Sequence, residues 1–129
     1  MMRLLLDTHL FLWMLDDSPR LSREARSRLA RPGTECCVSA VSFWEIAIKA
    51  SLRRKAFRVD VSKLIDAAIA SGLNLLPFLP QHAVRVAALP PHHADPFDRA
   101  LIAQAQAEPL VLLTQDRQLA RYGRGVSLV

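Results

Sequence analysis

Four acidic residues, far apart in the chain, stand next to runs that predict regular structure. They are Asp7, Glu45, Asp98 and Asp116. Asp7 and Asp116 each follow a short apolar run that predicts a buried strand. Glu45 and Asp98 fall in the first turn of predicted helices. Because the carboxyl ends of parallel strands face one crevice, we expect the four carboxylates to lie close together.

Converging carboxylates repel one another, and a hard cation removes that cost. Mg²⁺ prefers oxygen ligands in octahedral geometry and keeps several bound waters. Such a cation activates water and neutralises a phosphodiester transition state, and two cations about 4 Å apart hold both the attacking and the leaving oxygen. The pattern therefore predicts a magnesium-dependent nuclease that needs no histidine base.

Each acid also has a purely structural interpretation. The two acids that follow strands could cap the next helix. Ser42 and Glu45 have the spacing of a capping box, so Glu45 could reach back to the Ser42 amide. Asp95, just before a proline, is expected to be an N-cap, and Asp98 would then favour the helix dipole. These interpretations explain less well why acids recur after successive apolar strands.

The histidines give a weaker pattern. His92 and His93 precede Asp95, and a His-x-Asp cluster could bind zinc, but no second histidine pair accompanies it. His9 and His82 are expected to be partly packed helix residues. A loop histidine that touches substrate is not favoured, so we expect cleavage to survive replacement of both loop histidines.

Short apolar runs alternate with helical patterns along the chain. Strands are expected at 3–6, 35–39, 74–76, 110–114 and 126–128, and helices at 8–15, 22–30, 42–52, 61–71, 81–89, 96–107 and 115–122. This alternation predicts an α/β sandwich around a mostly parallel central sheet.

The composition sets the class of protein. The length of 129 residues predicts a single domain spanning 1–129, and 51% hydrophobic residues can fill a core. A net charge of +5 is a weak indication of a polyanionic partner. Adjacent Cys36 and Cys37 are expected to be free thiols, since neighbours rarely bridge. Asp7 and His9 interrupt the apolar N-terminus, so we expect no signal peptide, no membrane span and a cytoplasmic protein.

Several segments resemble PIN-domain proteins, and among these the VapC-type ribonuclease toxins of type II toxin–antitoxin pairs. The similar segments are Leu4–His9, Ser42–Ile46, His93–Ala105 and Leu113–Asp116, of which the stretch from Asp95 to Ala105 is the most specific. The resemblance covers nearly the whole chain. It implies a three-layer α/β/α sandwich, a magnesium or manganese cofactor, and cleavage of RNA.

The resemblance also assigns roles to residues. Position by position, the family's acidic quartet falls on Asp7, Glu45, Asp98 and Asp116, which would be both the catalytic residues and the metal ligands. Asp95 is an additional acid of the subfamily pattern, and Thr114 matches a hydroxyl position beside the last acid. The quartet is complete, so nothing indicates an inactive enzyme.

The partners implied by the family are an RNA substrate, a cognate antitoxin protein and a second copy in a homodimer. Four aromatic residues could line a partner groove or belong to the core, and for Trp44 we expect the core. They are Trp13, Phe43, Trp44 and Phe57. The basic segments 20–31 and 53–58 could follow an RNA backbone, because phosphate contacts dominate such affinity.

Two other functions compete with this one. Asp7 could be an aspartyl nucleophile for phosphoryl transfer, but such enzymes typically carry a second acid two residues later, where this chain has His9. The fold could instead be a catalytically inactive nucleic-acid or protein-binding module. The complete acidic quartet argues against that alternative.

Overall fold

The computed structural model describes residues 2–52 and 59–129. In chain order the elements are β1 (Met2–Leu6), α1 (Thr8–Leu15), α2 (Arg23–Ala30), β2 (Thr34–Ser39), α3 (Ala40–Leu52), α4 (Val61–Ala70), β3 (Asn74–Leu76), α5 (Pro80–Ala88), α6 (Pro96–Ala107), β4 (Val111–Thr114), the 3₁₀ helix η1 (Leu119–Tyr122) and β5 (Val126–Leu128).

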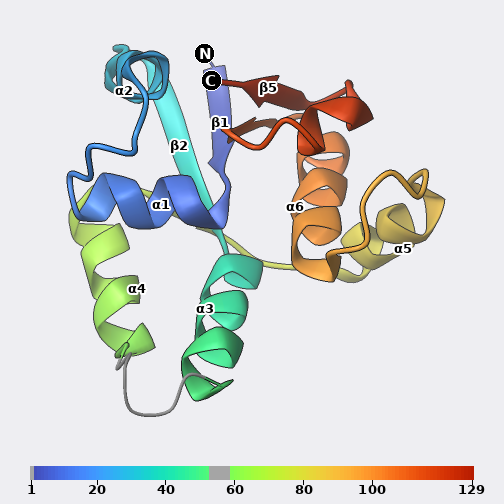
Figure 1. The fold of residues 1–129 in the computed structure, drawn as a ribbon, viewed down its shortest axis with the longest axis horizontal. Coiled ribbons are helices and arrows are strands. Elements are labelled where there is room, and N and C mark those ends of the chain that lie inside the picture. The colour runs from blue at the N-terminus through green and yellow to red at the C-terminus, as the bar shows by residue number, and fades with distance from the viewer. Residues whose placement is uncertain (1, 53–58) are drawn as a thin grey trace.

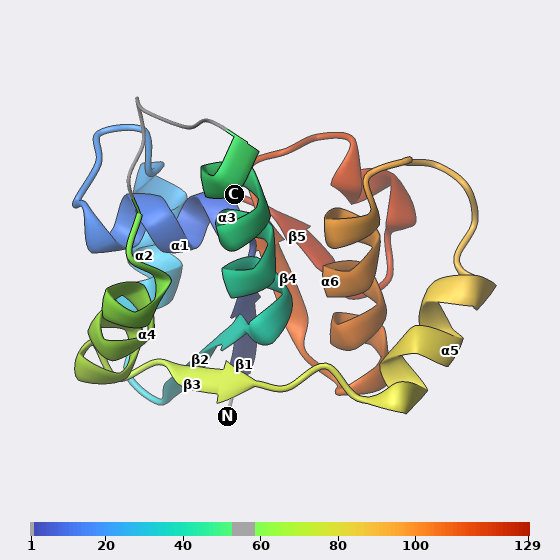
Figure 2. The ribbon, with the colours of Figure 1, turned by 90° about the horizontal axis from the view of Figure 1, so that it is seen from below.

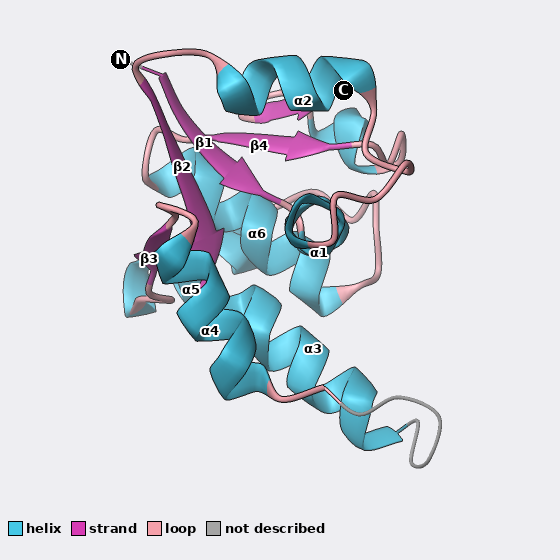
Figure 3. Ribbon diagram, turned by 90° about the vertical axis from the view of Figure 1, so that its left-hand side faces the viewer, coloured by secondary structure: helices cyan, strands magenta, loops and turns pink. Residues whose placement is uncertain are grey.

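The strands form one sheet in the order β3-β2-β1-β4-β5, and every neighbouring pair is parallel. The prediction of a mostly parallel sheet is therefore confirmed. Leu4, Leu5 and Leu6 in the central strand are all fully buried. A continuous apolar run is what a strand covered on both faces requires. Figure 3 shows β1, β2 and β4 fanning out as the sheet twists.

Alternate residues of β1 pack on opposite faces of the sheet, because successive side chains of a strand point to opposite sides. Leu4 and Leu6 share a core cluster with residues of α1, α2 and α4. Leu5 belongs to a second cluster that is built mainly with α6 and η1 and includes Val86 of α5. Figure 1 shows these two groups of helices on either side of the strands, which confirms the predicted α/β/α sandwich.

Helix α3 takes a different position from the helices of the two layers. Its Phe43 and Ile46 join the first cluster, whereas its Val41 joins the second. Seen from below, α3 lies between α1 and α6 across the carboxyl ends of the central strands (Figure 2). This placement puts α3 beside the edge of the sheet at which the sequence predicted that the acids meet.

Two helix boundaries differ from the sequence prediction in a way that matters for the site. Helix α3 begins at Ala40 rather than Ser42, and the Ser39 hydroxyl accepts a hydrogen bond from the Val41 amide (2.9 Å). The expected helix over 115–122 is reduced to η1, because the Asp116 carboxylate accepts from the Gln118 amide (2.9 Å) in a turn. The predicted position of Glu45 in a first turn is thus wrong, since it lies in the second turn of α3.

The structure also bears on the expectations of free thiols and of no membrane span. Cys36 and Cys37 are both free thiols. Among residues 2–52 and 59–129, no helix combines the length and the apolar character needed to cross a membrane.

Candidate active site

Asp7 occupies the junction between β1 and α1 and serves two purposes. Its Oδ1 accepts a hydrogen bond from the Leu10 amide (2.8 Å), so it is the N-cap of α1, as the structural interpretation proposed. Its Oδ2 accepts from the Thr114 hydroxyl (2.6 Å). Burial raises the pKa of this carboxyl, against the opposing effect of the two hydrogen bonds. Capping therefore does not exclude a role for Asp7 in a site.

Thr114, the last residue of β4, connects Asp7 to Asp116. While its hydroxyl donates to Asp7, the same oxygen accepts from the Asp116 amide (3.0 Å). Since β1 and β4 are parallel neighbours, their carboxyl ends bring the two acids side by side. The Asp116 side chain is exposed, in contrast to the buried Asp7.

Glu45 approaches the same place from α3. Its side chain is buried, with Oε1 accepting from the Thr8 hydroxyl (2.8 Å) and Oε2 bonded to the Lys49 ammonium. The Thr8 oxygen also lies 2.9 Å from the Ser42 hydroxyl. The capping-box interpretation of Glu45 is therefore wrong, because its carboxylate is held by α1 and by Lys49 on its own helix.

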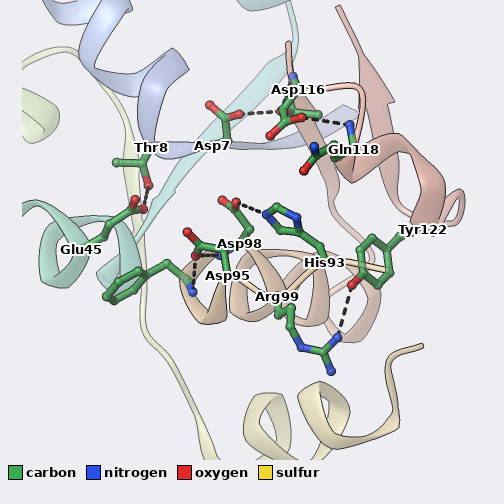
Figure 4. Close-up of polar contacts among 12 residues, drawn as sticks. Asp7, Thr8, Glu45, His93, Asp95, Asp98, Arg99, Asp116, Gln118 and Tyr122 are labelled. Atoms are coloured by element: carbon green, nitrogen blue, oxygen red, sulfur yellow. Dashed lines mark hydrogen bonds and ion pairs between the residues drawn. The ribbon is translucent and has the colours of Figure 1, made fainter. Parts of the chain in front are cut away.

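Asp98 comes from the first turn of α6, as predicted. Asp95 is the N-cap of this helix, with Oδ1 accepting from the amides of Phe97 (2.8 Å) and Asp98 (3.1 Å). That leaves the Asp98 carboxylate free to face the carboxyl ends of the strands (Figure 4). His93 Nε2 lies 2.9 Å from Asp98 Oδ2.

The electrostatics of Asp98 indicate a crowded anionic environment. Burial raises its pKa to about 6, and the negative charges of Asp95 and Glu45 add to the increase, whereas the hydrogen bond from His93 opposes it. A carboxyl that is costly to ionise and lies beside other acids is typical of functional sites.

The four acids named from the sequence face a shared space in Figure 4. Asp7 interacts electrostatically with Asp116, and Asp98 interacts with Glu45. One ligand atom each from His93, Asp98 and Asp116 can be chosen so that all three lie within 4.8 Å of one another. Such a set of oxygen donors, with one nitrogen, fits a divalent cation.

Comparison with protein families gives one decisive match. The model of the PIN domain matches residues 4–125. The chain belongs to the PIN-domain family. A comparison with curated protein sequences gives no match.

Several solved structures have a fold similar to that of this PIN domain. The chain is similar to the crystal structure of VapBC2 from Rickettsia felis bound to a promoter DNA fragment (TM-score 0.70, 16% identity, 99% of this chain and 98% of that chain). It is also similar to the crystal structure of DNA-bound VapBC from Salmonella typhimurium (TM-score 0.68, 20% identity, 100% of this chain and 98% of that chain). A third similar structure is that of VapBC-5 from Mycobacterium tuberculosis (TM-score 0.61, 20% identity, 98% of this chain and 97% of that chain). At these identities the similarity establishes a common fold.

Sequence reasoning missed several residues that support the acids of this PIN domain. Thr8 and Lys49 hold Glu45, and His93 contacts Asp98 although no role in the site was favoured for it. Lys49 stands one helical turn after Glu45, a spacing that could have predicted their ion pair. His9 and His82 lie in helices, as predicted. His9 is exposed with its ring stacked on Trp13, whereas His82 is fully buried rather than partly packed.

The aromatic residues are distributed differently from the prediction. Trp44 is 57% exposed, so its expected place in the core is wrong, and its ring meets Phe97 edge-on at 4.8 Å between centroids. Phe43 is buried in the core, and Trp13 is half-buried against it. Phe57 lies outside the described residues.

The first basic segment runs away from the site. At its beginning, Gln115, next to Asp116, accepts from the Ser22 amide and donates to the Arg20 carbonyl (2.9 and 3.1 Å). Near its end, Arg28 reaches Ser127 and Met2, the first residue of β1. Only the beginning of this segment is therefore near the acids. The second basic segment, 53–58, lies outside the described residues.

Proposed function

We propose that this PIN domain is a magnesium-dependent endoribonuclease, the toxin of a VapBC-type toxin–antitoxin pair acting in the cytoplasm. The observation that carries the proposal is the set of carboxylates at the carboxyl ends of β1 and β4, in which Asp98 has a pKa of about 6. Burial, and then the charges of Asp95 and Glu45, raise this pKa, and a divalent cation would favour the ionised carboxylate against both effects.

We assign Asp7, Glu45, Asp98 and Asp116 as the metal ligands and catalytic residues. When bound, Mg²⁺ or Mn²⁺ supplies an activated water and neutralises charge that develops on the phosphodiester. The protein's own side chains orient the ligands: Thr114 holds Asp7, and Thr8 holds Glu45.

Lys49 contributes a positive charge at the edge of this site. Its pKa is raised chiefly by the hydrogen bond to Glu45, with the charges of Asp95 and Asp98 adding to the increase. The half-exposed ammonium can contact a phosphate oxygen while it limits the repulsion among the acids. Together with the exposed Arg20 and Arg23 near the start of α2, it provides an electrostatic basis for binding RNA.

The enzymatic part of the proposal is tested with purified protein and a labelled RNA. We expect cleavage in Mg²⁺ or Mn²⁺, none in excess chelator, and recovery when the metal is restored. Undiminished cleavage in chelator would contradict the metal mechanism. RNA binding without cleavage under any metal would favour the alternative of an inactive binding module.

The partner is proposed from the structural neighbours, which are VapBC proteins. A toxin should arrest growth when it is expressed alone, and a small protein encoded beside it should relieve the arrest. Asp98→Asn is the matched control, because it should express normally and allow growth. A homodimer is proposed as well, and light scattering of the purified chain measures it directly.

A further inference from the structure

His93 lies where a fifth ligand of the proposed metal site would be. Its side chain is 17% exposed, and it projects from the loop between α5 and α6 toward the carboxylates (Figure 4). Nε2 lies 2.9 Å from Asp98 Oδ2. One ring nitrogen of His93, one carboxylate oxygen of Asp98 and one of Asp116 all lie within 4.8 Å of one another.

The spacing of His93 and Asp98 matches that of two atoms that share one cation. Two ligand atoms at about 2.1 Å from a metal are about 3 Å apart when they are at right angles and about 4 Å apart when they are opposite. The distance of 2.9 Å between His93 and Asp98 corresponds to the right-angled pair. A cation bound by both groups would replace their hydrogen bond, and the imidazole would turn so that the lone pair of Nε2 points to the metal.

An imidazole ligand raises the affinity of a site for some cations more than for others. Carboxylates suit Mg²⁺ and Mn²⁺, whereas imidazole nitrogen suits transition metals and adds little for Mg²⁺. We propose that His93 Nε2 is a direct metal ligand, and that this single nitrogen makes the site prefer Mn²⁺ to Mg²⁺. The inference rests on the proposed function only in taking the same acids as the other ligands.

The direct test is pulsed electron paramagnetic resonance of the full chain loaded with Mn²⁺, without RNA. Wild type should show the nitrogen coupling of one directly bound imidazole, and labelling histidine with ¹⁵N should change that coupling. His93→Gln should abolish it. His92→Gln is the matched control, because His92 is exposed and its ring packs edge-on against Tyr122, and it should keep the coupling.

Titration calorimetry supplies a second measurement. His93→Gln should weaken Mn²⁺ binding about tenfold or more, because losing even a residue that only orients a ligand costs 10- to 100-fold in affinity. Mg²⁺ binding should weaken less than about threefold, since imidazole adds little for Mg²⁺.

Three results would overturn the proposal: no nitrogen coupling in wild type, persistence of the coupling in His93→Gln, or equal losses for both metals, which would mean that His93 only positions Asp98. If His93→Gln does not fold, the coupling of ¹⁵N-labelled wild type and its retention in His9→Gln and His92→Gln decide the question. Because RNA is absent, failure to cleave RNA leaves these measurements unaffected and counts only against the proposed function.

Discussion

At the scale of single residues, each buried acid of the site is held by a specific donor. Thr114 and the Leu10 amide hold Asp7, and Thr8 holds Glu45. Asp98 has a histidine as its partner and lies near other acids, and its pKa is the one raised to about 6. The acids are thus oriented before a metal binds, and burial makes both Asp7 and Asp98 costly to ionise.

Asp98→Asn should reduce RNA cleavage in Mg²⁺ by about 100-fold or more, because it keeps the shape of the side chain and removes a charged ligand. Asp95→Asn is the control: its Oδ1 can still accept from the Phe97 and Asp98 amides, so unfolding should change by less than about 0.5 kcal/mol. Cleavage across a magnesium titration and thermal unfolding measure both effects. A larger loss of activity for Asp95→Asn would mean that the two roles are interchanged.

The raised pKa of Asp98 also predicts how stability depends on pH in the metal-free protein. Between about pH 4 and pH 6 the folded state binds a proton at Asp98 that the unfolded state has lost, so the free energy of unfolding should fall as pH rises through this range. Above about pH 6 this contribution is constant and unfavourable. Asp98→Asn lacks it and should be more stable at pH 7 by about 1 kcal/mol, after allowance for partial exposure.

The measurement is urea unfolding of both proteins in chelator at several pH values. Asp7, whose pKa burial also raises, is present in both proteins, so its effect cancels in the comparison. Parallel curves with no difference in slope between pH 4 and pH 6 would show that Asp98 ionises normally. Saturating Mg²⁺ should reverse the advantage of the variant, because the metal binds the ionised carboxylate.

At the scale of elements, single hydroxyl groups connect the ends of segments that are distant in sequence. Thr114 joins β4 to the junction of β1 and α1. Thr8, the first residue of α1, joins that helix to α3 through Glu45 and Ser42. One hydroxyl has one proton, so Thr8 donates to the Glu45 carboxylate and accepts from Ser42.

Thr8→Val should therefore show whether Thr8 acts by orienting Glu45. Valine keeps the shape of threonine but removes the donor to a buried carboxylate, and we expect a loss of about 2 kcal/mol in unfolding free energy. Cleavage should fall roughly tenfold as Glu45 loses its orientation, while Thr8→Ser should restore both quantities. If Thr8→Val cleaves RNA like wild type, then Thr8 is not needed to position Glu45.

At the scale of the whole molecule, the site is where the layers of the sandwich meet. Its acids come from the junction of β1 and α1, from α3 and α6, and from the segment after β4, so holding them together involves both faces of the sheet (Figures 1 and 4). A cation bound by all four acids would link these elements. It would be present in the folded state and absent from the unfolded chain.

Mg²⁺ should therefore raise the thermal unfolding midpoint. At a free concentration 100 times the dissociation constant the stabilisation is about 2.7 kcal/mol, which for a domain of this size is about 10 °C. Asp98→Asn should lose most of this increase, whereas Asp95→Asn should keep it. Differential scanning calorimetry with and without chelator measures the shift, and an equal increase in all three proteins would indicate that the ion binds elsewhere.

The sequence by itself determined the elements and which acids follow them. Apolar runs and helix periodicity depend on neighbouring residues, so they predicted the parallel sheet, the N-cap Asp95 and the first-turn position of Asp98. They left capping by Asp7 as an alternative, which the structure bears out. The family pattern added the roles that we propose for the quartet.

Only the tertiary structure decided what each acid contacts. The partners of Asp7 and Glu45 are 107 and 37 residues away in sequence, and His93 reaches Asp98 only because the loop before α6 folds back over its first turn. Trp44, whose apolar type predicted the core, lies on the exposed side of α3 because Phe43 and Ile46 face inward. Local sequence patterns determine helices, strands and caps over a few residues. These contacts depend instead on how the helices pack against a twisted sheet.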